Sequence, residues 1–529
     1  MYRINGIRMP LGYTEEDLRK AILKKLNTYK SNLVSIKLLS RSIDARYKNN
    51  ILYVLNVAVE LRSNKGIRAE EYKMPPTSIK ELGYKPISTN KKVFVVGSGP
   101  AGLFAGLTLA ELGFKPIIIE RGGAVEERVE KIDLLRNSGI LDVETNVQFG
   151  EGGAGTFSDG KLNTGISKDF TSVVFGELIN AGAPEDIAYE SAPHVGTDEL
   201  RKVVKNMRAI LKEKGATLLT HSKLTDIKIS ENKITEITIN GTQKEKIDYL
   251  VVAIGQSAED TIRMLAGRGM VLSAKPFSLG VRVEHSQRFI DKAQYGDSYK
   301  LLPPADYKLS THVSSGRGVY TFCMCPGGEV VCSSCEEGTI ITNGMSNRAR
   351  DTEYANSAVL VSVTPQDFGG SLFGGFEARK ELERKAFALG GGNYKAPAQY
   401  YGDFIRGKVT DKVIHSSYLP SVSGADLNSL LPRYLTEGIK EGMEAFGRKI
   451  KGFNDDDALF IAPETHSSCP IRMERDERGE SNLKGIYPCG EGAGYAGGIT
   501  SSAVDGIRQA LNIYAKELEV VINENTHSY

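Results

Sequence analysis

Three spaced glycines, Gly97, Gly99 and Gly102, follow the apolar run Val93–Val96 and lead into a helix-like segment. In this G-x-G-x-x-G pattern the first glycine allows a sharp turn, the second lets the backbone approach a pyrophosphate, and the third lets the helix pack closely on the strand. The helix N-terminus then offers free N–H groups and a partial positive charge to the phosphates. Glu120 ends the next apolar run, where its carboxylate can accept both hydroxyls of an adenosine ribose. The pattern predicts a site for an adenine dinucleotide, and a structural turn is the alternative.

Residues beside these glycines extend the predicted site. Pro100 suits an early helical position, where a missing N–H costs little. An acid at Glu120 followed by Arg121 argues against a 2′-phosphate on the ribose. We expect further cofactor contacts from Ser98, Pro100, Ala101, Arg121, Arg128 and Leu224.

A second pattern of strand, glycine, acid and helix lies near the C-terminus, in IYPCGEGAGYAGGITSSAVDG (486–506). This order resembles the C-terminal FAD motif of the glutathione-reductase-like flavoproteins. The resemblance implies that the acid contacts the ribityl and pyrophosphate end of FAD, and that the helix N-terminus stabilises the negative charge of the reduced flavin. The segment IDYLVVAIGQSA (247–258) resembles another motif of the same superfamily. FAD is therefore the expected cofactor, with contacts from Gly255, Gly490, Glu491, Gly497, Gly498 and Ile499.

A further glycine-rich stretch, NVQFGEGGAGTFSDGKLNTGI (146–166), contains few apolar residues. Gly153 and Gly155 allow the backbone to approach a ligand closely, and Thr156 and Lys161 add a hydroxyl and a cation. A long polar run inside a compact domain is more often functional than idle. We expect it along the pyrophosphate and the flavin edge, and a flexible surface loop is the alternative.

The longer motifs YTFCMCPGGEVV, TNGMSNRARD, GGGNYKAPAQ and CPIRM extend this likeness. Together with the segments above they resemble a bacterial family of FAD-dependent dehydrogenases over essentially the whole chain. The resemblance implies a two-part flavoprotein fold with an inserted substrate domain, and it brings no substrate. The chain departs from the family pattern at the cysteines of VVCSSCEEG, and at His466 and Cys469, where Arg and Ser are expected.

Four residues are candidates for the chemistry at the flavin: Lys161, Arg282, His285 and Cys325. His285 could be a general acid or base near neutral pH, and Arg282 could bind an anionic substrate. Lys161 could stabilise the reduced flavin, and Cys325, next to Pro-Gly-Gly, could be a redox-active thiol. A satisfied or surface histidine is the alternative for His285, and a small buried hydrophobic residue is the alternative for Cys325.

Cys323, Cys325, Cys332 and Cys335 form the spacing C-x-C-x6-C-x2-C. Such a spacing could hold zinc or an iron–sulfur cluster. Cysteines on strands often serve as small buried hydrophobic residues, and we expect no metal. Six cysteines in the chain are too few for a disulfide scaffold.

Around these motifs, residues 1–62 are predicted to form a small β-α-β-β domain. Thr14 and Asp17 have the spacing of a helix cap at the start of its helix. Residues 63–90 contain several prolines and many polar residues, and we expect a linker there.

The rest of the chain predicts an α/β fold. Residues 91–267 alternate strands and helices, the pattern of a Rossmann-type FAD-binding domain with a parallel sheet and a β-meander. Residues 268–460 predict an inserted α+β substrate domain, with helices near 376–389 and 426–447. Residues 461–529 return to the FAD-binding domain and end in its last helix.

A net charge of +2 gives no bulk field to recruit nucleic acid or an anionic membrane. Apolar runs stay well short of the ~20 residues of a membrane span, and no signal sequence is recognisable, so a cytoplasmic location is expected. The leading prediction is an FAD-dependent oxidoreductase acting on a small substrate. Alternatives are an RNA-modifying or RNA-binding flavoprotein that uses the basic stretch SRSIDARYKNN (40–50), and a non-catalytic flavoprotein.

The electron donor is a separate question. No second G-x-G-x-x-G lies between a strand and a helix, so a dedicated NAD(P) domain is not expected. NAD(P)H would then bind transiently as a donor, or electrons would pass directly to a substrate or a carrier protein.

Overall fold

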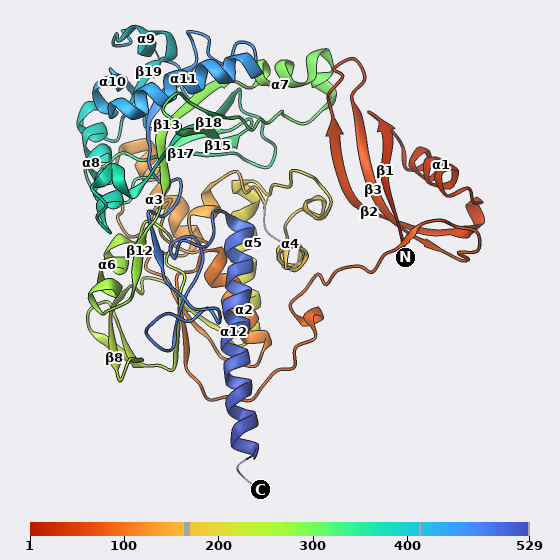
Figure 1. Ribbon diagram of the computed structural model, residues 1–529, viewed down its shortest axis with the longest axis horizontal. Coiled ribbons are helices and arrows are strands. Elements are labelled where there is room, and N and C mark those ends of the chain that lie inside the picture. The colour runs from red at the N-terminus through yellow and green to blue at the C-terminus, as the bar shows by residue number, and fades with distance from the viewer. Residues whose placement is uncertain (163–169, 412–413, 527–529) are drawn as a thin grey trace.

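The computed structural model describes residues 1–162, 170–411 and 414–526, with side chains to residue 519. A five-stranded sheet and a seven-stranded sheet form the body, and a four-stranded sheet with one helix stands to one side, joined by an extended segment (Figure 1). The predicted fold class is confirmed: an α/β FAD-binding domain, an inserted α+β domain and a small N-terminal β-α-β-β domain.

The five-stranded sheet is parallel and brings together segments from distant parts of the chain. Its strands, in sheet order, are β23 (Ile486–Pro488), β11 (Tyr249–Val252), β5 (Val93–Val96), β6 (Ile117–Ile119) and β7 (Thr217–Leu219). The central strands are continuously apolar and buried, as expected for a parallel sheet covered on both faces. Because β23 pairs with β11, the two predicted FAD motifs meet at one edge of one sheet.

Helices cover one face of this sheet and a meander covers the other. The helices are α2 (Pro100–Glu111), α5 (Thr197–Glu213) and α12 (Ile499–Thr526), and the meander strands are β8 (Leu224–Ser230), β9 (Lys233–Ile239) and β10 (Gln243–Lys246). A Cβ at Gly506 would lie 2.2 Å from the Ala101 carbonyl oxygen, so glycine is needed where α12 touches α2. This contact holds the N-terminal ends of both helices close to the ends of the strands.

The seven-stranded sheet belongs to the inserted domain. Its order is β14 (Ser310–His312), β15 (Gly318–Cys325), β18 (Tyr354–Val363), β13 (Phe277–Ser286), β21 (Leu459–Glu464), β19 (Ala396–Tyr400) and β20 (Val422–Gly424). Its apolar core includes side chains of the long helix α11 (Arg433–Lys449). Since β21 continues to Glu464, this sheet extends a few residues beyond the predicted domain end at 460.

The remaining elements connect or flank the sheets. Their bounds are α3 (Val125–Ser138), α4 (Thr171–Asn180), α6 (Glu259–Gly267), α7 (Gln287–Tyr295), α8 (Gly374–Leu389), α9 (Tyr401–Arg406), α10 (Leu427–Leu430), β12 (Leu272–Ala274), β16 (Glu329–Cys332), β17 (Thr342–Met345) and β22 (Ile471–Met473). The single helix predicted over 426–447 is wrong, because Pro432 separates α10 from α11. Within the described residues, no helix is both long and apolar enough to cross a bilayer.

The N-terminal domain comprises β1 (Tyr2–Pro10), α1 (Glu15–Leu26), β2 (Leu33–Asp44) and β3 (Leu52–Leu61). The predicted cap of its helix is confirmed, since the Thr14 hydroxyl accepts from the Asp17 N–H and the Asp17 carboxylate accepts from the Thr14 N–H. The segment predicted as a linker adds a two-residue edge strand, β4 (Glu70–Glu71), beside β1. So short a strand has no sequence periodicity by which it could be recognised.

Candidate functional site

A cavity of about 470 Å³ lies where the carboxyl ends of the parallel strands face the seven-stranded sheet. This volume is within the ~300–1,000 Å³ usual for cofactor sites. Most of the cofactor-binding residues predicted from the sequence line it: Gly97, Gly99, Pro100, Ala101, Glu120, Arg121, Gly153, Gly155, Lys161, Leu224, Gly255, Glu491, Gly497, Gly498 and Ile499. The other five, Ser98, Gly102, Arg128, Thr156 and Gly490, are buried behind its wall.

The three glycines of the first loop differ in what fixes them. Gly97 has φ +95°, and a Cβ there would lie 2.3 Å from the Ala253 carbonyl oxygen. A Cβ at Gly102 would lie 1.9 Å from the Gly97 carbonyl oxygen, so α2 packs directly on the turn. At Gly99 the nearest atom is the Gly153 Cα at 3.8 Å, an ordinary contact. The chain therefore needs glycine at 97 and 102, whereas at 99 the absence of a side chain serves the cavity.

Glu120 organises the loops around the nucleotide end of the cavity. One carboxylate oxygen accepts from the Ser98 N–H and hydroxyl, both at 2.9 Å, and the other accepts from the Gly122 and Gly150 N–H groups at 3.1 and 3.0 Å. The side chain is 5% exposed and lines the cavity. A carboxylate has about four acceptor positions, and the chain already supplies four donors. Glu120 thus positions the loops, and its predicted contact with a ribose would have to share acceptor positions that the chain already occupies.

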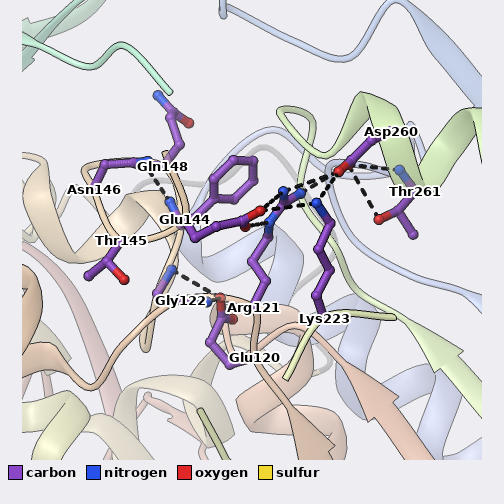
Figure 2. Close-up of polar contacts among 12 residues, drawn as sticks. Glu120, Arg121, Gly122, Glu144, Thr145, Asn146, Gln148, Lys223, Asp260 and Thr261 are labelled. Carbon is purple, nitrogen blue, oxygen red and sulfur yellow. Dashed lines mark hydrogen bonds and ion pairs between the residues drawn. The ribbon is translucent and has the colours of Figure 1, made fainter. Parts of the chain in front are cut away.

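Arg121 is held between two carboxylates (Figure 2). Its guanidinium donates to Glu144 and, at 3.0 and 3.1 Å, to Asp260. Lys223 also pairs with both acids, at 3.0 and 2.6 Å. The Arg121 guanidinium lies 4.0 Å from the centroid of the Phe149 ring. This cluster lies at the end of the cavity near Glu120, and its cations are already paired with acids, which agrees with the prediction that the ribose carries no 2′-phosphate.

Arg128 supports the second glycine-rich stretch from behind. Its guanidinium donates to the carbonyl oxygens of Asn146, Val147, Glu151 and Gly153 at 2.6–3.1 Å. Complete burial lowers its pKa to about 9. Arg128 thus ties together four backbone positions of this stretch. Residues 163–166 of the same stretch lie outside the described residues.

The C-terminal motif supplies the other end of the cavity. The first residues of α12 line it together with Gly497 and Gly498. Glu491 accepts from Gln256 Nε2 at 2.8 Å, and burial raises its pKa to about 7, against the opposing charges of Arg379 and Lys275. Gly490 does not reach the cavity; its N–H donates to Asp505 at 2.8 Å and fixes the turn after β23.

Three family profiles match the chain: an FAD binding domain at residues 90–238, the C-terminal domain-like family of FAD-dependent proteins at 276–467, and a domain of unknown function, DUF8436, at 1–60. An uncharacterized protein of Clostridium beijerinckii is 45% identical over 526 residues, which cover 97% of this chain and 98% of that protein. The chain belongs to this family of FAD-dependent proteins. Its cofactor is FAD.

Solved structures with a weaker likeness include the halogenase PltM and the protein CtdE in complex with FAD. PltM is 10% identical with a TM-score of 0.36, over 82% of this chain and 71% of PltM. CtdE is 11% identical with a TM-score of 0.32, over 80% of this chain and 84% of CtdE. Scores this low carry no conclusion about the reaction of this FAD-dependent protein.

The residues present fit FAD. The absence of a side chain at Gly99 leaves space at the cavity wall, and the N-terminal ends of α2 and α12 both open into the cavity. Such helix ends favour phosphate at one end and the negative charge of a reduced flavin at the other. The residues around Gly99 would hold the pyrophosphate, and those around Gly498 the flavin ring.

The four predicted catalytic residues are not all at the cavity. Lys161 lines it, with its Nζ 3.7 Å from the Asp159 carboxylate. Arg282 is fully buried beneath the wall and pairs with Glu464, whose carboxylate does line the cavity. Cys325 is 0% exposed and turned into the core, whereas its neighbour Cys323 faces the cavity.

His285 lies away from the cavity. It is packed between the rings of Phe289 and Phe453, and its Nε2 is 2.8 Å from the Phe453 carbonyl oxygen. Burial lowers its pKa to about 4. A neutral imidazole in this position stabilises the packing of the inserted domain and does not line the cavity.

The cysteines described by the structure are free thiols. Cys332 shares a hydrogen bond with the Ser334 hydroxyl at 3.3 Å, and Cys335 packs in a separate small cluster with Phe149. Among the described residues, no three His, Cys, Asp or Glu side chains come together in an arrangement that could hold a metal ion.

Several residues at the cavity were not predicted from the sequence. Ser257 donates to or accepts from His466 Nδ1 at 3.0 Å, and His466 Nε2 lies 3.1 Å from Glu383. Gln256, next to Ser257, links Glu491 to the His466 carbonyl. The position of Gln256 and Ser257 directly after Gly255 was a signal for their presence in the site, and the departure from the family pattern at His466 was another.

Proposed function

We propose that this FAD-dependent protein is an oxidoreductase that transfers electrons between FAD and a small substrate bound against the seven-stranded sheet. The observation that supports it is the second end of the cavity, which the predicted FAD motifs do not account for. Strands and loops of the inserted domain place polar and ionisable side chains there: Thr321, Cys323, Asn343, Glu464 and His466. A cavity shared by a cofactor and such side chains suits a substrate held over the flavin.

FAD supplies the electron chemistry when bound, and the chain supplies charge and orientation. Lys161 places a cation at the cavity, balanced by Asp159. A second cation, Arg350, also pairs with Asp159, at 2.6 Å, so the carboxylate does not fully neutralise Lys161. Lys161 is therefore placed to bind an anionic group of the substrate or to stabilise negative charge on the reduced cofactor.

A chain of hydrogen bonds can handle protons at the same place. Ser257 and His466 line the cavity, and Glu383 lies behind His466. Burial would raise the pKa of Glu383, but its hydrogen bonds with His466 and Thr465 outweigh burial and keep that pKa low, so this carboxylate orients the imidazole. A second cavity of about 20 Å³, room for about one water, borders both His466 and Glu383. His466 would pass a proton between Ser257 and a water in this second cavity.

The test is anaerobic stopped-flow reduction of the FAD-loaded protein by NADH and by NADPH, followed at the absorbance of oxidised flavin. We expect one nucleotide to reduce the flavin, and a screen of small oxidants to identify a compound that reoxidises it. Lys161→Met should retain FAD but reduce more slowly, by about tenfold if one charge interaction of ~1.4 kcal/mol is lost. A flavin inert to both nucleotides and to every added donor would instead indicate a non-catalytic flavoprotein.

The RNA alternative gains no support from the N-terminal basic stretch. Arg41 pairs with Glu190 and Arg46 pairs with Asp44, while Lys48 donates to the Ala293 carbonyl. Contacts with phosphate would have to break these interactions. A salt-dependent shift of RNA by the full chain, lost when residues 1–62 are removed, is the measurement that would favour it.

A further inference from the structure

Cys323 and Cys325 lie at the end of the cavity formed by the inserted domain. Cys323 lines the cavity, and Cys325 is buried behind its wall. Both lie at the end of β15, and Cys323 and Met324 line the cavity. Cys325 is 0% exposed, directly behind, and its thiol is 3.3 Å from the Cys323 carbonyl oxygen. The Cys323 thiol is thus accessible to a ligand in the cavity, and the Cys325 thiol lies beside it in the core.

The backbone is distorted at this point. Cys323 has φ +44°, a region that residues other than glycine rarely adopt. The pairing of β15 with β18 shifts register between Phe322 and Cys325, which marks a bulge. Bulges re-aim side chains, and strained backbone is retained mainly at functional sites. The distortion turns Cys323 toward the cavity, where a regular strand would point both cysteines to one face.

The surroundings shift the pKa values of the two thiols in opposite directions, which suits Cys323 to act as a nucleophile and Cys325 as a proton donor. A hydrogen bond from Cys325 lowers the pKa of Cys323 to about 6, assisted by the charges of Arg282 and Lys161 and opposed by burial and Glu464. The same hydrogen bond, with burial, raises the pKa of Cys325. Arg282 also donates to the Cys323 carbonyl at 3.1 Å. These opposite shifts favour the thiolate form at Cys323 and the thiol form at Cys325.

The remaining cysteines lack this arrangement. Burial raises the pKa of each of them: Cys332, Cys335, Cys469 and Cys489. A thiolate open to a cavity is the reactive form of cysteine, whereas buried thiols are inert. A thiolate alone could attack many electrophiles. A second thiol beside it can displace a sulfur bound to the first, and this step is typical of disulfide reduction.

We propose that Cys323 and Cys325 are a redox-active thiol pair that reduces a small disulfide admitted to the cavity, with Cys323 as the attacking sulfur and Cys325 as the resolving one. The proposal rests on the oxidoreductase function proposed above, because reduced FAD must restore the pair. The sequence predicted a redox-active thiol at Cys325 alone, whereas this proposal assigns that role to Cys323 and Cys325 together. It also names the substrate class, a small disulfide.

The steps balance. The Cys323 thiolate attacks the disulfide RSSR, forming a mixed disulfide and releasing RS⁻. The Cys325 thiol then attacks the Cys323 sulfur, forming the Cys323–Cys325 disulfide and releasing RSH. The Cys323–Cys325 disulfide would then accept two electrons and one proton, which bound FAD would supply in its reduced, anionic form, and would return to one thiolate and one thiol. Net, FADH⁻ and RSSR give FAD, RS⁻ and RSH.

The exchange is tested without any flavin reduction. The native oxidised holoprotein is mixed with 2,2′-dithiodipyridine, and released pyridinethione is counted against time. We expect a fast phase of two thiones per chain, and peptide mapping without reductant should find a bond between Cys323 and Cys325. Cys325→Ser should release one thione and keep a mixed disulfide on Cys323, and Cys323→Ser should lose the fast phase. Cys332→Ser is the control and should behave as wild type.

The protonation argument has its own readout in the pH dependence of iodoacetamide alkylation at Cys323. Its rate should titrate near pH 6 in the wild type. Cys325→Ser, which keeps a donor, should titrate close to wild type, and Cys325→Ala should titrate at higher pH. The proposal is overturned if Cys323→Ser leaves the fast phase intact, or if wild type stops at the mixed disulfide. If the exchange succeeds but the flavin stays inert to every donor, the oxidoreductase function fails instead.

Discussion

Gly99→Ala should separate FAD binding from folding. Gly99 has φ −69° and ψ −178°, a conformation open to any residue, and a Cβ there meets nothing closer than 3.8 Å. Replacing glycine by alanine in a compatible conformation stabilises a chain by ~0.4–1 kcal/mol. Loss of the better helix N-cap costs about as much. The two effects nearly cancel, so the apoprotein should unfold within ~1 kcal/mol of wild type.

The effect on FAD should be much larger. The new methyl group occupies the wall where the pyrophosphate approaches the N-terminal end of α2. Displacing the phosphate from one N–H removes a hydrogen bond to a charged group, worth ~1.5–3 kcal/mol. FAD affinity should therefore fall about 10- to 150-fold, and further in Gly99→Val.

The assay is a titration of apoprotein with FAD, followed by the quenching of flavin fluorescence, with thermal unfolding of the same apoprotein in parallel. Gly102→Ala is the contrasting variant, since its Cβ would lie 1.9 Å from the Gly97 carbonyl oxygen and should disrupt the apoprotein itself. Wild-type affinity in Gly99→Ala would refute the placement of the pyrophosphate.

Three further predictions test single carboxylates and one histidine. Glu120→Ala should lower the free energy of unfolding of the apoprotein by ~2–4 kcal/mol in urea denaturation, because Ser98 and Gly150 lose their acceptor; unchanged stability would contradict its role in the loops. The pKa of Glu491 is raised from 4.5 to about 7, so its contribution to stability is complete below pH 4.5 and lost as the pH rises through 7. Glu491→Gln apoprotein should thus be more stable than wild type by ~3 kcal/mol at pH 8 and equal to it at pH 4.5, and thermal unfolding at both pH values decides. His285→Gln should lower stability by ~1–3 kcal/mol and leave the rate of flavin reduction unchanged, and a slower reduction would place His285 in the chemistry after all.

Much of the fold follows from local sequence patterns. The glycines of both FAD motifs predict turns and helix starts that the structure contains, and the meander and the Thr14 cap are read from equally local signals. The break at Pro432 was also visible, but the apolar periodicity continues across it and favoured one helix. Local patterns cannot identify β4, whose two residues pair with β1 only because the chain passes beside it.

The end of the cavity lined by the FAD motifs was more predictable than the end lined by the inserted domain. Phosphate binding needs glycine and helix ends at fixed spacing, whereas a substrate pocket depends on which face of each strand meets the cavity. A regular strand places Cys323 and Cys325 on one face, and only the bulge separates them. Arg282 and His285 occupy opposite faces of β13, and neither lines the cavity, whose wall at this end is formed by residues of β15, β17 and β21.

The buried guanidinium of Arg128 has a consequence for how the holoprotein is made. It donates to four backbone carbonyls of the loop, and none of these hydrogen bonds involves a nucleotide. We therefore expect the loop to keep its shape in the apoprotein, so that FAD can bind after the chain has folded. Lysine at that position has three donors in place of five and could not bind all four carbonyls.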